Sequence, residues 1–226
     1  MRGHQRQRPA KCASGGFRGR GEKTRVRFLG RDLRRQFNRA QSRNDAPRAQ
    51  GPYAITKLDG EYYLGMFCDE GRLETAALRF FNVFGPRQNP DGAYAAAVPI
   101  FIDKAIKGEV ITVFGDGEQT RDFIYVKDIV GALAFAAETS GVTGIFNAGY
   151  GGQITINKLA DKIIASAATD SRILHAPERP GDVKHSQATA DKLRTAGWKP
   201  RYTLDEGLHA TFDYFMRDRS NDGTRS

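Results

Sequence analysis

The chain has 226 residues, a mass of 25.0 kDa and a formal net charge of +9, a length that suits one α/β domain or a domain with a tail. It contains no run of 18 apolar residues and its basic start lacks an apolar stretch, so we expect neither a membrane span nor a Sec signal. Two cysteines, Cys12 and Cys68, exclude a disulfide scaffold and a cysteine-rich zinc site and favour a reducing compartment, which we expect to be the cytoplasm.

The basic character is confined to the first 50 residues. Residues 1–50 hold 15 Lys and Arg against 3 acids, whereas residues 51–226 carry a net charge of −3. The only Val, Ile or Leu residues in the first segment are Val26, Leu29 and Leu33. This composition cannot bury enough apolar surface to offset the entropy of ordering, so the segment is predicted to be disordered unless it is a frame-shifted product.

From Gly51 onwards, segments with strand and helix patterns alternate. The first is a helix over residues 53–70, with Ile55, Leu58, Tyr62 and Met66 at helical spacing. The alternation predicts an α/β fold with a largely parallel, doubly wound sheet. The other predicted elements are a strand over 75–81, a helix over 95–106 closed by Gly108, strands over 111–114 and 123–126 around a glycine turn at 115–117, a helix over 128–138, a strand over 144–148, a helix with Thr155 as N-cap, a strand over 173–175, a short helix over 189–196 and a last helix opened by a capping box from Thr203 to Glu206.

The pair Tyr53 and Lys57 is the sharpest chemical motif. Their i, i+4 spacing places a phenol and an ammonium on one face of the predicted helix. A lysine charge near a tyrosine stabilises the phenolate and lowers the tyrosine pKa, which prepares the phenol to act as a general base. A lone pair of this spacing is more often part of an ordinary amphipathic helix, so the context decides.

The context is a set of motifs in fixed order. After YAITK at 53–57 come LRFFNVFGPR at 78–87, VFGDG at 113–117, TRDFIYV at 120–126 and RPGDV at 179–183. Together they resemble the extended short-chain dehydrogenase/reductase family, the NAD-dependent epimerases and dehydratases of nucleotide sugars. Within it, residues 51–216 are most similar to UDP-glucose and UDP-N-acetylglucosamine 4-epimerases. The resemblance implies the end of a Rossmann sheet plus a smaller substrate domain.

The resemblance implies NAD-dependent epimerisation at C4 of a UDP-hexose through a 4-keto intermediate. Tyr53 is then the base, and Lys57 assists it and holds the nicotinamide ribose. Phe81 is implied to lie near the nicotinamide. The residues implied to bind the UDP-sugar are Asn82, Val113, Phe114, Arg121, Arg179 and Asp182. Arginines suit phosphate oxygens, and the backbone of the 113–114 strand suits a uracil edge.

The N-terminal dinucleotide-binding half of this fold is expected to be missing. No G-x-x-G-x-x-G follows a strand, and no S-A-x-x-Y-G-like segment precedes Tyr53. However, the codons of Lys11–Gln36, read one nucleotide later, permit a family-like helix, strand and S-A-A-I-Y-G segment, whose serine falls across Leu29 and Gly30. We therefore interpret residues 2–50 as a frame-shifted reading and 51–226 as the C-terminal part of the enzyme, which predicts an inactive chain.

Several alternatives remain open. The chain is also compatible with a nucleotide-sugar dehydratase or decarboxylase, or with a non-catalytic nucleotide-sugar binding remnant. A genuine basic arm would bind nucleic acid through phosphates, but it lacks interleaved aromatics, so no nucleic-acid partner is expected. The four histidines show no ligand spacing, so no metal is expected. A homodimer is a family expectation only.

Overall fold

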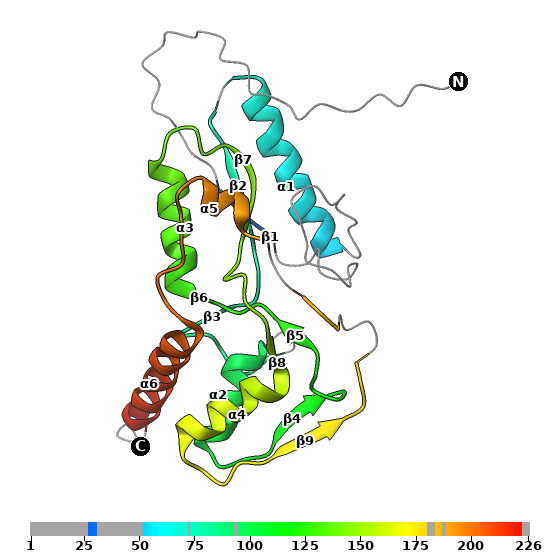
Figure 1. Ribbon diagram of the computed structural model, residues 1–226, viewed down its shortest axis with the longest axis vertical. Coiled ribbons are helices and arrows are strands. Elements are labelled where there is room, and N and C mark those ends of the chain that lie inside the picture. Colours follow the sequence, from blue (N-terminus) through cyan, green and yellow to red (C-terminus); the bar gives the residue numbers. More distant parts are fainter. Residues whose placement is uncertain are drawn as a thin grey trace, which may run out of the picture.

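The computed structural model describes residues 27–30, 52–71, 73–92, 95–179, 184–186 and 189–222, with side chains described between 55 and 220. These residues form an elongated molecule with a sheet and its helices at one end and a second helical part at the other (Figure 1). None of the described helices has the length and apolar content needed to cross a membrane.

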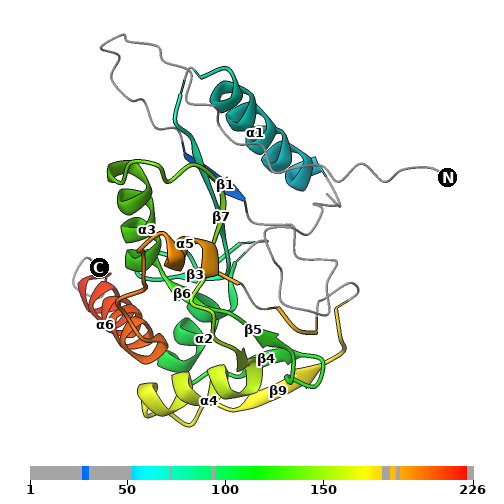
Figure 2. The same cartoon turned by 45° about the horizontal axis from the view of Figure 1, so that its top comes forward.

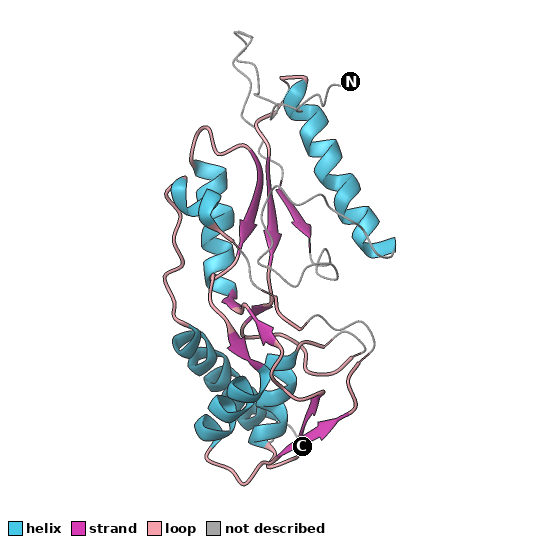
Figure 3. Cartoon of the chain, turned by 45° about the vertical axis from the view of Figure 1, so that its right-hand side comes forward, coloured by secondary structure: helices cyan, strands magenta, loops and turns pink. Residues whose placement is uncertain are grey.

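A three-stranded parallel sheet forms the first part. Strands β1 (Arg27–Gly30), β2 (Ala76–Phe80) and β7 (Gly144–Ala148) lie in the order β1-β2-β7. Of the segment predicted to be disordered or frame-shifted, only 27–30 is described, as the edge strand β1. Helix α1 (Pro52–Asp69) lies on one side of the strands and α3 (Val126–Glu138) on the other (Figure 3). The parallel pairing confirms the predicted α/β class.

Helix α1 covers nearly the predicted span, but three of the four residues of the predicted apolar stripe face outward and the fourth, Leu58, is partly buried. Ile55, Tyr62 and Met66 are 50%, 65% and 50% exposed. The buried side chains in the described part of the helix are Glu61 and Leu64. The helix therefore meets the sheet through a face that contains a carboxylate.

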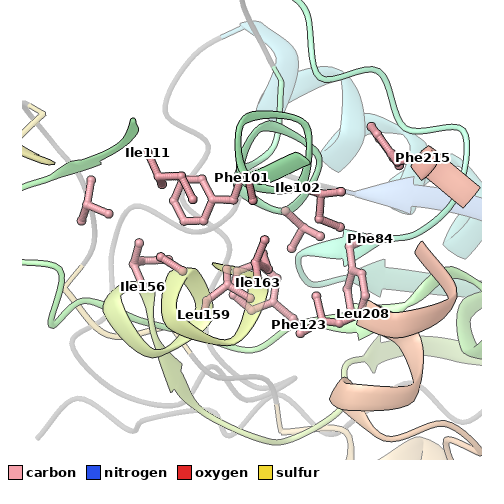
Figure 4. Close-up of a cluster of buried hydrophobic side chains, with 14 of the residues drawn as sticks. Phe84, Phe101, Ile102, Ile111, Phe123, Ile156, Leu159, Ile163, Leu208 and Phe215 are labelled. Atoms are coloured by element: carbon pink, nitrogen blue, oxygen red, sulfur yellow. The ribbon is translucent and has the colours of Figure 1, made fainter. Parts of the chain in front are cut away.

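The second part surrounds one large hydrophobic core. Helices α2 (Ala97–Ile106), α4 (Ile156–Ala167) and α6 (Leu204–Asp222) pack there with the parallel pair β4 (Ile111–Phe114) and β9 (Ile173–Ala176) (Figure 2). Side chains from all three helices and from β4 interdigitate in this cluster (Figure 4). A second cluster lies behind the sheet, between β2, β7, α3 and the short helix α5 (Asp191–Thr195).

Short strand pairs join the two parts. Strands β3 (Val83–Phe84) and β6 (Ile124–Tyr125) pair in parallel, and β5 (Thr120–Arg121) pairs antiparallel with β8 (Ile154–Thr155). Both predicted helix starts are confirmed: the Thr155 hydroxyl accepts from the Lys158 amide, and Thr203 and Glu206 form the reciprocal capping box. Helix α3 begins two residues earlier than predicted, because β6 is only two residues long.

Candidate functional site

A cavity of about 440 Å³ lies between α2, β4 and the turn that leaves β2. This volume is within the range of sites that hold small ligands. It brings together five of the six residues expected to bind a UDP-sugar, and the sixth, Asp182, lies outside the described residues. The described lining residues are Asn82, Val83, Phe84, Ala95, Ala96, Ala97, Val98, Ile100, Phe101, Lys104, Thr112, Val113, Phe114, Gln119, Arg121, Phe123, Ile156 and Arg179.

The cavity is built for an anion. Its described lining contains three cationic side chains, Lys104, Arg121 and Arg179, and no carboxylate. The Lys104 ammonium donates to the Val110 carbonyl at 3.1 Å and lies 3.9 Å from the Glu109 carboxylate, so the two arginines carry most of the positive charge that faces the cavity. Helix α2 also begins at the wall, after Ala96, whose methyl side chain cannot cap the first amides. The N-terminal end of a helix carries a partial positive charge, which adds to that of the three cations. A phosphate-bearing ligand fits this field.

The backbone of β4 turns two residues that line the cavity, Thr112 and Phe114, away from β9. The amides of Ile111 and Gly115 donate to carbonyls on the β9 side, at 2.9 and 2.8 Å. Backbone groups alternate in direction along a strand, so Val113 also faces β9 and Phe114 faces the opposite edge. At that edge the Phe114 carbonyl accepts a hydrogen bond from the side-chain amide of Gln119, at 2.7 Å. The edge expected for a nucleobase is therefore that of Phe114, while Val113 contributes its buried side chain to the wall.

Arg179 reaches the cavity from the segment after β9. Its guanidinium carbon lies 3.7 Å from the centroid of the Phe114 ring, which is a close cation–π contact. Arg179 itself is exposed. It therefore combines a stacked, pre-positioned plane with donors that remain accessible to a ligand.

Asn82 occupies a strained corner at the end of β2. Its φ is +32°, a conformation in which residues other than glycine are uncommon. The side-chain amide donates to the Asp122 carbonyl at 2.7 Å, and the buried Asp122 carboxylate accepts from the Gly151 amide at 2.9 Å. These bonds fix the corner, so Asn82 has a structural role as well as a place in the cavity wall.

The residues expected to act on the sugar and the cofactor lie on α1 and at the end of β2. Tyr53 is in the first turn of α1, and its side chain lies outside the described residues. Lys57 is half-buried, and Phe81, directly after β2, is 4% exposed. Among the described residues, neither lines the cavity. Within the described part of the chain, no group of three His, Cys, Asp or Glu residues is arranged to hold a metal.

Two polar residues of the cavity were missed by the sequence reasoning. Lys104 lies three residues after Phe101 on α2, and Gln119 lies between two of the quoted motifs. The signal for Lys104 was a charge on the same helical face as apolar residues that line the site. Gln119 carried no such signal, because its role depends on reaching back to the Phe114 carbonyl.

The comparisons with known proteins agree with this arrangement. The family model described as "NAD dependent epimerase/dehydratase family" matches residues 29–149. A putative UDP-glucose 4-epimerase of Methanocaldococcus jannaschii is 36% identical over 167 residues, which are 74% of this chain and 54% of that protein. The chain thus spans about half the length of the curated relatives it matches.

Two solved structures are similar over most of the chain. UDP-N-acetylglucosamine 4-epimerase from Methanobrevibacter ruminantium, in complex with UDP-N-acetylmuramic acid, superposes with a TM-score of 0.81 at 36% identity, covering 86% of this chain and 63% of that one. The Thermus thermophilus UDP-glucose 4-epimerase in complex with NAD superposes with a TM-score of 0.75 at 31% identity, covering 85% of this chain and 64% of that one. With its parallel sheet, its anion cavity and these matches, the chain belongs to the NAD dependent epimerase/dehydratase family.

Proposed function

We propose that the cavity binds the UDP part of a nucleotide sugar, and that the whole protein epimerises a UDP-hexose at C4. The observation that carries this proposal is the convergence of Asn82, Phe114, Arg121 and Arg179 on one cationic cavity. Similar proteins named UDP-glucose 4-epimerase and UDP-N-acetylglucosamine 4-epimerase support the reaction. We assign the protein to the cytoplasm, because a chain with two cysteines favours a reducing compartment.

Each part of UDP has a matching group in the proposal. The Phe114 amide and the second lone pair of the Phe114 carbonyl, which also accepts from Gln119, bind the uracil edge, which offers one donor between two acceptors. Arg121 and Arg179 bind the diphosphate, with Lys104 adding charge. Asp182 binds a ribose hydroxyl. The hexose then points towards the end of β2 and the start of α1.

The proton chemistry is assigned to Tyr53. As a phenolate it accepts the proton of the C4 hydroxyl, and the ammonium of Lys57 stabilises the phenolate and holds the nicotinamide ribose. NAD, when bound, supplies the redox chemistry of such a reaction. The described residues fit only its nicotinamide end, through Lys57 and Phe81. The glycine-rich run at 149–152 is not suited to its diphosphate, because the Gly151 amide already donates to a buried carboxylate.

Calorimetric titration of the purified chain tests the proposal. We expect UDP and UDP-glucose to bind, uridine to bind more weakly because it lacks the diphosphate, and N3-methyl-UDP to bind more weakly because its base has no N–H to donate to the Phe114 carbonyl. Equal affinity for UDP and N3-methyl-UDP would refute the assignment of the base site. Epimerase turnover with added NAD is expected to be absent in this chain, and turnover would refute its inactivity.

A second candidate is a non-catalytic nucleotide-sugar binding protein. The observation that favours it is that the described cavity wall comes entirely from residues 82–179, whereas the sequence shows no dinucleotide loop. Binding of UDP without any effect of NAD, and no turnover after a dinucleotide-binding half is restored, would favour this role over epimerisation.

We also propose that the protein forms a homodimer through α1. The outward stripe of Ile55, Tyr62 and Met66 is apolar and at least half exposed, which is unusual for a surface without a partner. Light scattering on a sizing column is expected to give a dimer mass, and Tyr62→Glu a monomer mass. A monomer for the unmodified chain would refute this proposal.

The frame-shift interpretation of residues 2–50 is retained as a proposal. One observation supports it: β1 pairs in parallel beside β2, where the shifted reading places a strand before its serine. The nucleotide sequence over these codons tests it. A shifted frame that is open and encodes S-A-A-I-Y-G is expected, and stop codons or unrelated residues in that frame would refute it.

A further inference from the structure

A buried ion pair joins α1 to β2. The Arg79 Nε and Nη2 atoms donate to the two carboxylate oxygens of Glu61, both at 2.7 Å. The side chains are 11% and 4% exposed. A two-pronged contact between a planar guanidinium and a carboxylate fixes orientation as well as distance. The pair therefore defines how α1 is rotated and how far it is shifted along its axis.

A second described contact of α1 is apolar. Leu64 is buried, and the Thr75 hydroxyl donates to the Leu64 carbonyl at 3.0 Å. The apolar contact of a leucine is not directional, so it tolerates rotation of the helix. The Glu61 carboxylate, on the same buried side of the helix, supplies a directional contact.

The pair joins the helix that carries the proposed base to the strand that leads to Asn82 in the cavity wall. Tyr53, Lys57 and Glu61 follow one another at four-residue steps, so they lie along one side of α1. On β2, Arg79 is two residues before Phe81 and three before Asn82. Alternation along a strand places Arg79 and Phe81 on the same face. The ion pair between Glu61 and Arg79 therefore connects α1, which carries the proposed base, with the strand that leads to Asn82 in the cavity wall.

The distances involved make this tie important for proton transfer. A slip of α1 by one residue would move Tyr53 by about 1.5 Å, and a slip of one turn by about 5.4 Å. A general base must lie within about 3 Å of the atom that loses its proton. A misplacement of about 1 Å can lower a rate by about 100-fold. Even a small shift of the helix therefore removes Tyr53 from reach.

We propose that Glu61 and Arg79 are positioning residues that set the register of α1 on the sheet and thereby the reach of Tyr53 and Lys57. This inference rests on the proposed function for its catalytic meaning. Its structural content, the placement of α1, is measurable without turnover.

Pulsed electron paramagnetic resonance measures that placement. Spin labels are attached to cysteines introduced at two exposed sites, Asp59 on α1 and Asp161 on α4, with Cys12 and Cys68 replaced by serine. One narrow distance distribution is expected for the parent chain. Glu61→Gln is expected to broaden the distribution or shift it by about 1.5 Å or more, the rise of one helix residue.

Further variants separate positioning from stability. Arg79→Lys keeps the positive charge but cannot form the two parallel hydrogen bonds to Glu61. It is expected to broaden the distance distribution, and it provides the test if the Glu61→Gln variant does not fold. The reversed pair, Glu61→Arg with Arg79→Glu, is expected to restore the narrow distribution. As a matched control, Asp205→Asn breaks the exposed ion pair with Lys162, which has an N–O distance of 2.8 Å, and should leave the distribution unchanged.

Two results have different meanings. If Arg79→Lys lowers the melting temperature while the distance distribution stays narrow and unshifted, the pair is only structural and the positioning role is refuted. If the parent chain fails to bind UDP, the proposed function fails, but the distance measurement still decides the placement of α1. In variants that keep the fold, UDP affinity is expected to stay within about twofold, because the cavity is remote from the pair.

Discussion

Gly207 allows α6 to pack directly against the wall of the cavity. It lies in the first turns of the helix and is buried. A Cβ atom at this position would be 2.8 Å from the Phe84 ring and 3.0 Å from the Cβ and Cγ of Tyr125. Ordinary contacts between carbon atoms are about 3.5–4.0 Å. Gly207→Ala therefore requires α6 to move away by several tenths of an ångström or the Phe84 ring to be displaced.

Two opposing effects decide the size of the change. Alanine is about 1 kcal/mol better than glycine inside a helix. Overpacking of a well-filled core costs about 1–3 kcal/mol. Phe84 and Tyr125 are 2% and 3% exposed and pack against each other, so little relaxation is available. We expect Gly207→Ala to lower the free energy of unfolding by about 1 kcal/mol net.

Gly65→Ala is the matched control. Gly65 lies inside α1, and a Cβ there would meet no atom within 4 Å. No steric cost then opposes the better helix propensity of alanine, so Gly65→Ala should raise the free energy of unfolding by about 0.5–1 kcal/mol. Denaturant unfolding followed by circular dichroism measures both, and UDP titration should show weaker binding only for Gly207→Ala, since Phe84 lines the cavity. Equal stabilisation of the two variants would refute the steric reasoning.

Three further predictions concern the cavity, the last helix and the core. Arg121→Ala or Arg179→Ala should weaken UDP binding by about 10–100-fold, the equivalent of one charge-assisted hydrogen bond. Arg217→Ala, on the surface of α6, should leave UDP binding unchanged. Unchanged UDP affinity in both cavity variants would exclude the cavity as the phosphate site. The backbone amide and the hydroxyl of Thr203 donate to the Glu206 carboxylate and lower its pKa below the ordinary value of 4.5. The stabilisation of the fold by Glu206 should therefore be present above pH 4.5 and disappear as the pH falls through the folded pKa. A Glu206→Gln variant with the same acid-unfolding profile as the parent chain would contradict this expectation. Leu159→Ala should cost about 2–5 kcal/mol in thermal or denaturant unfolding, because the side chain is fully buried, and a loss well below 1 kcal/mol would mean that the core collapses around the gap.

Most of the elements could be predicted from periodicity, and the failures have physical causes. The face of α1 was not predictable, because its buried side carries Glu61 and its apolar residues Tyr62 and Met66 point outward. Hydrophobic periodicity cannot detect a helix that is held to a sheet by an ion pair, since the partner Arg79 lies on a different element.

In the candidate site, residues that stand in sequence motifs were predictable, whereas contacts between different segments were not. Arg121 and Arg179 were predictable because they stand in ordered motifs, and the structure brings both to the cavity. Which residue of the 113–114 strand offers its backbone was not predictable, since it depends on the direction of the β4–β9 hydrogen bonds. Gln119 was missed because its contact with the Phe114 carbonyl is created by the glycine turn between them.

The two separate hydrophobic clusters have a consequence for cooperativity. One cluster backs the cavity and contains Val98, Phe101 and Val113, while the other fills the space behind β2 and β7. Parts of a protein with their own cores can open independently, with different free energies. A ligand that binds only one part stabilises that part. Amide hydrogen exchange should therefore slow on α2 and α4 when UDP is added, while exchange on β7 keeps its original rate. The proposed recognition of the nucleotide is then expected to survive partial opening of the sheet.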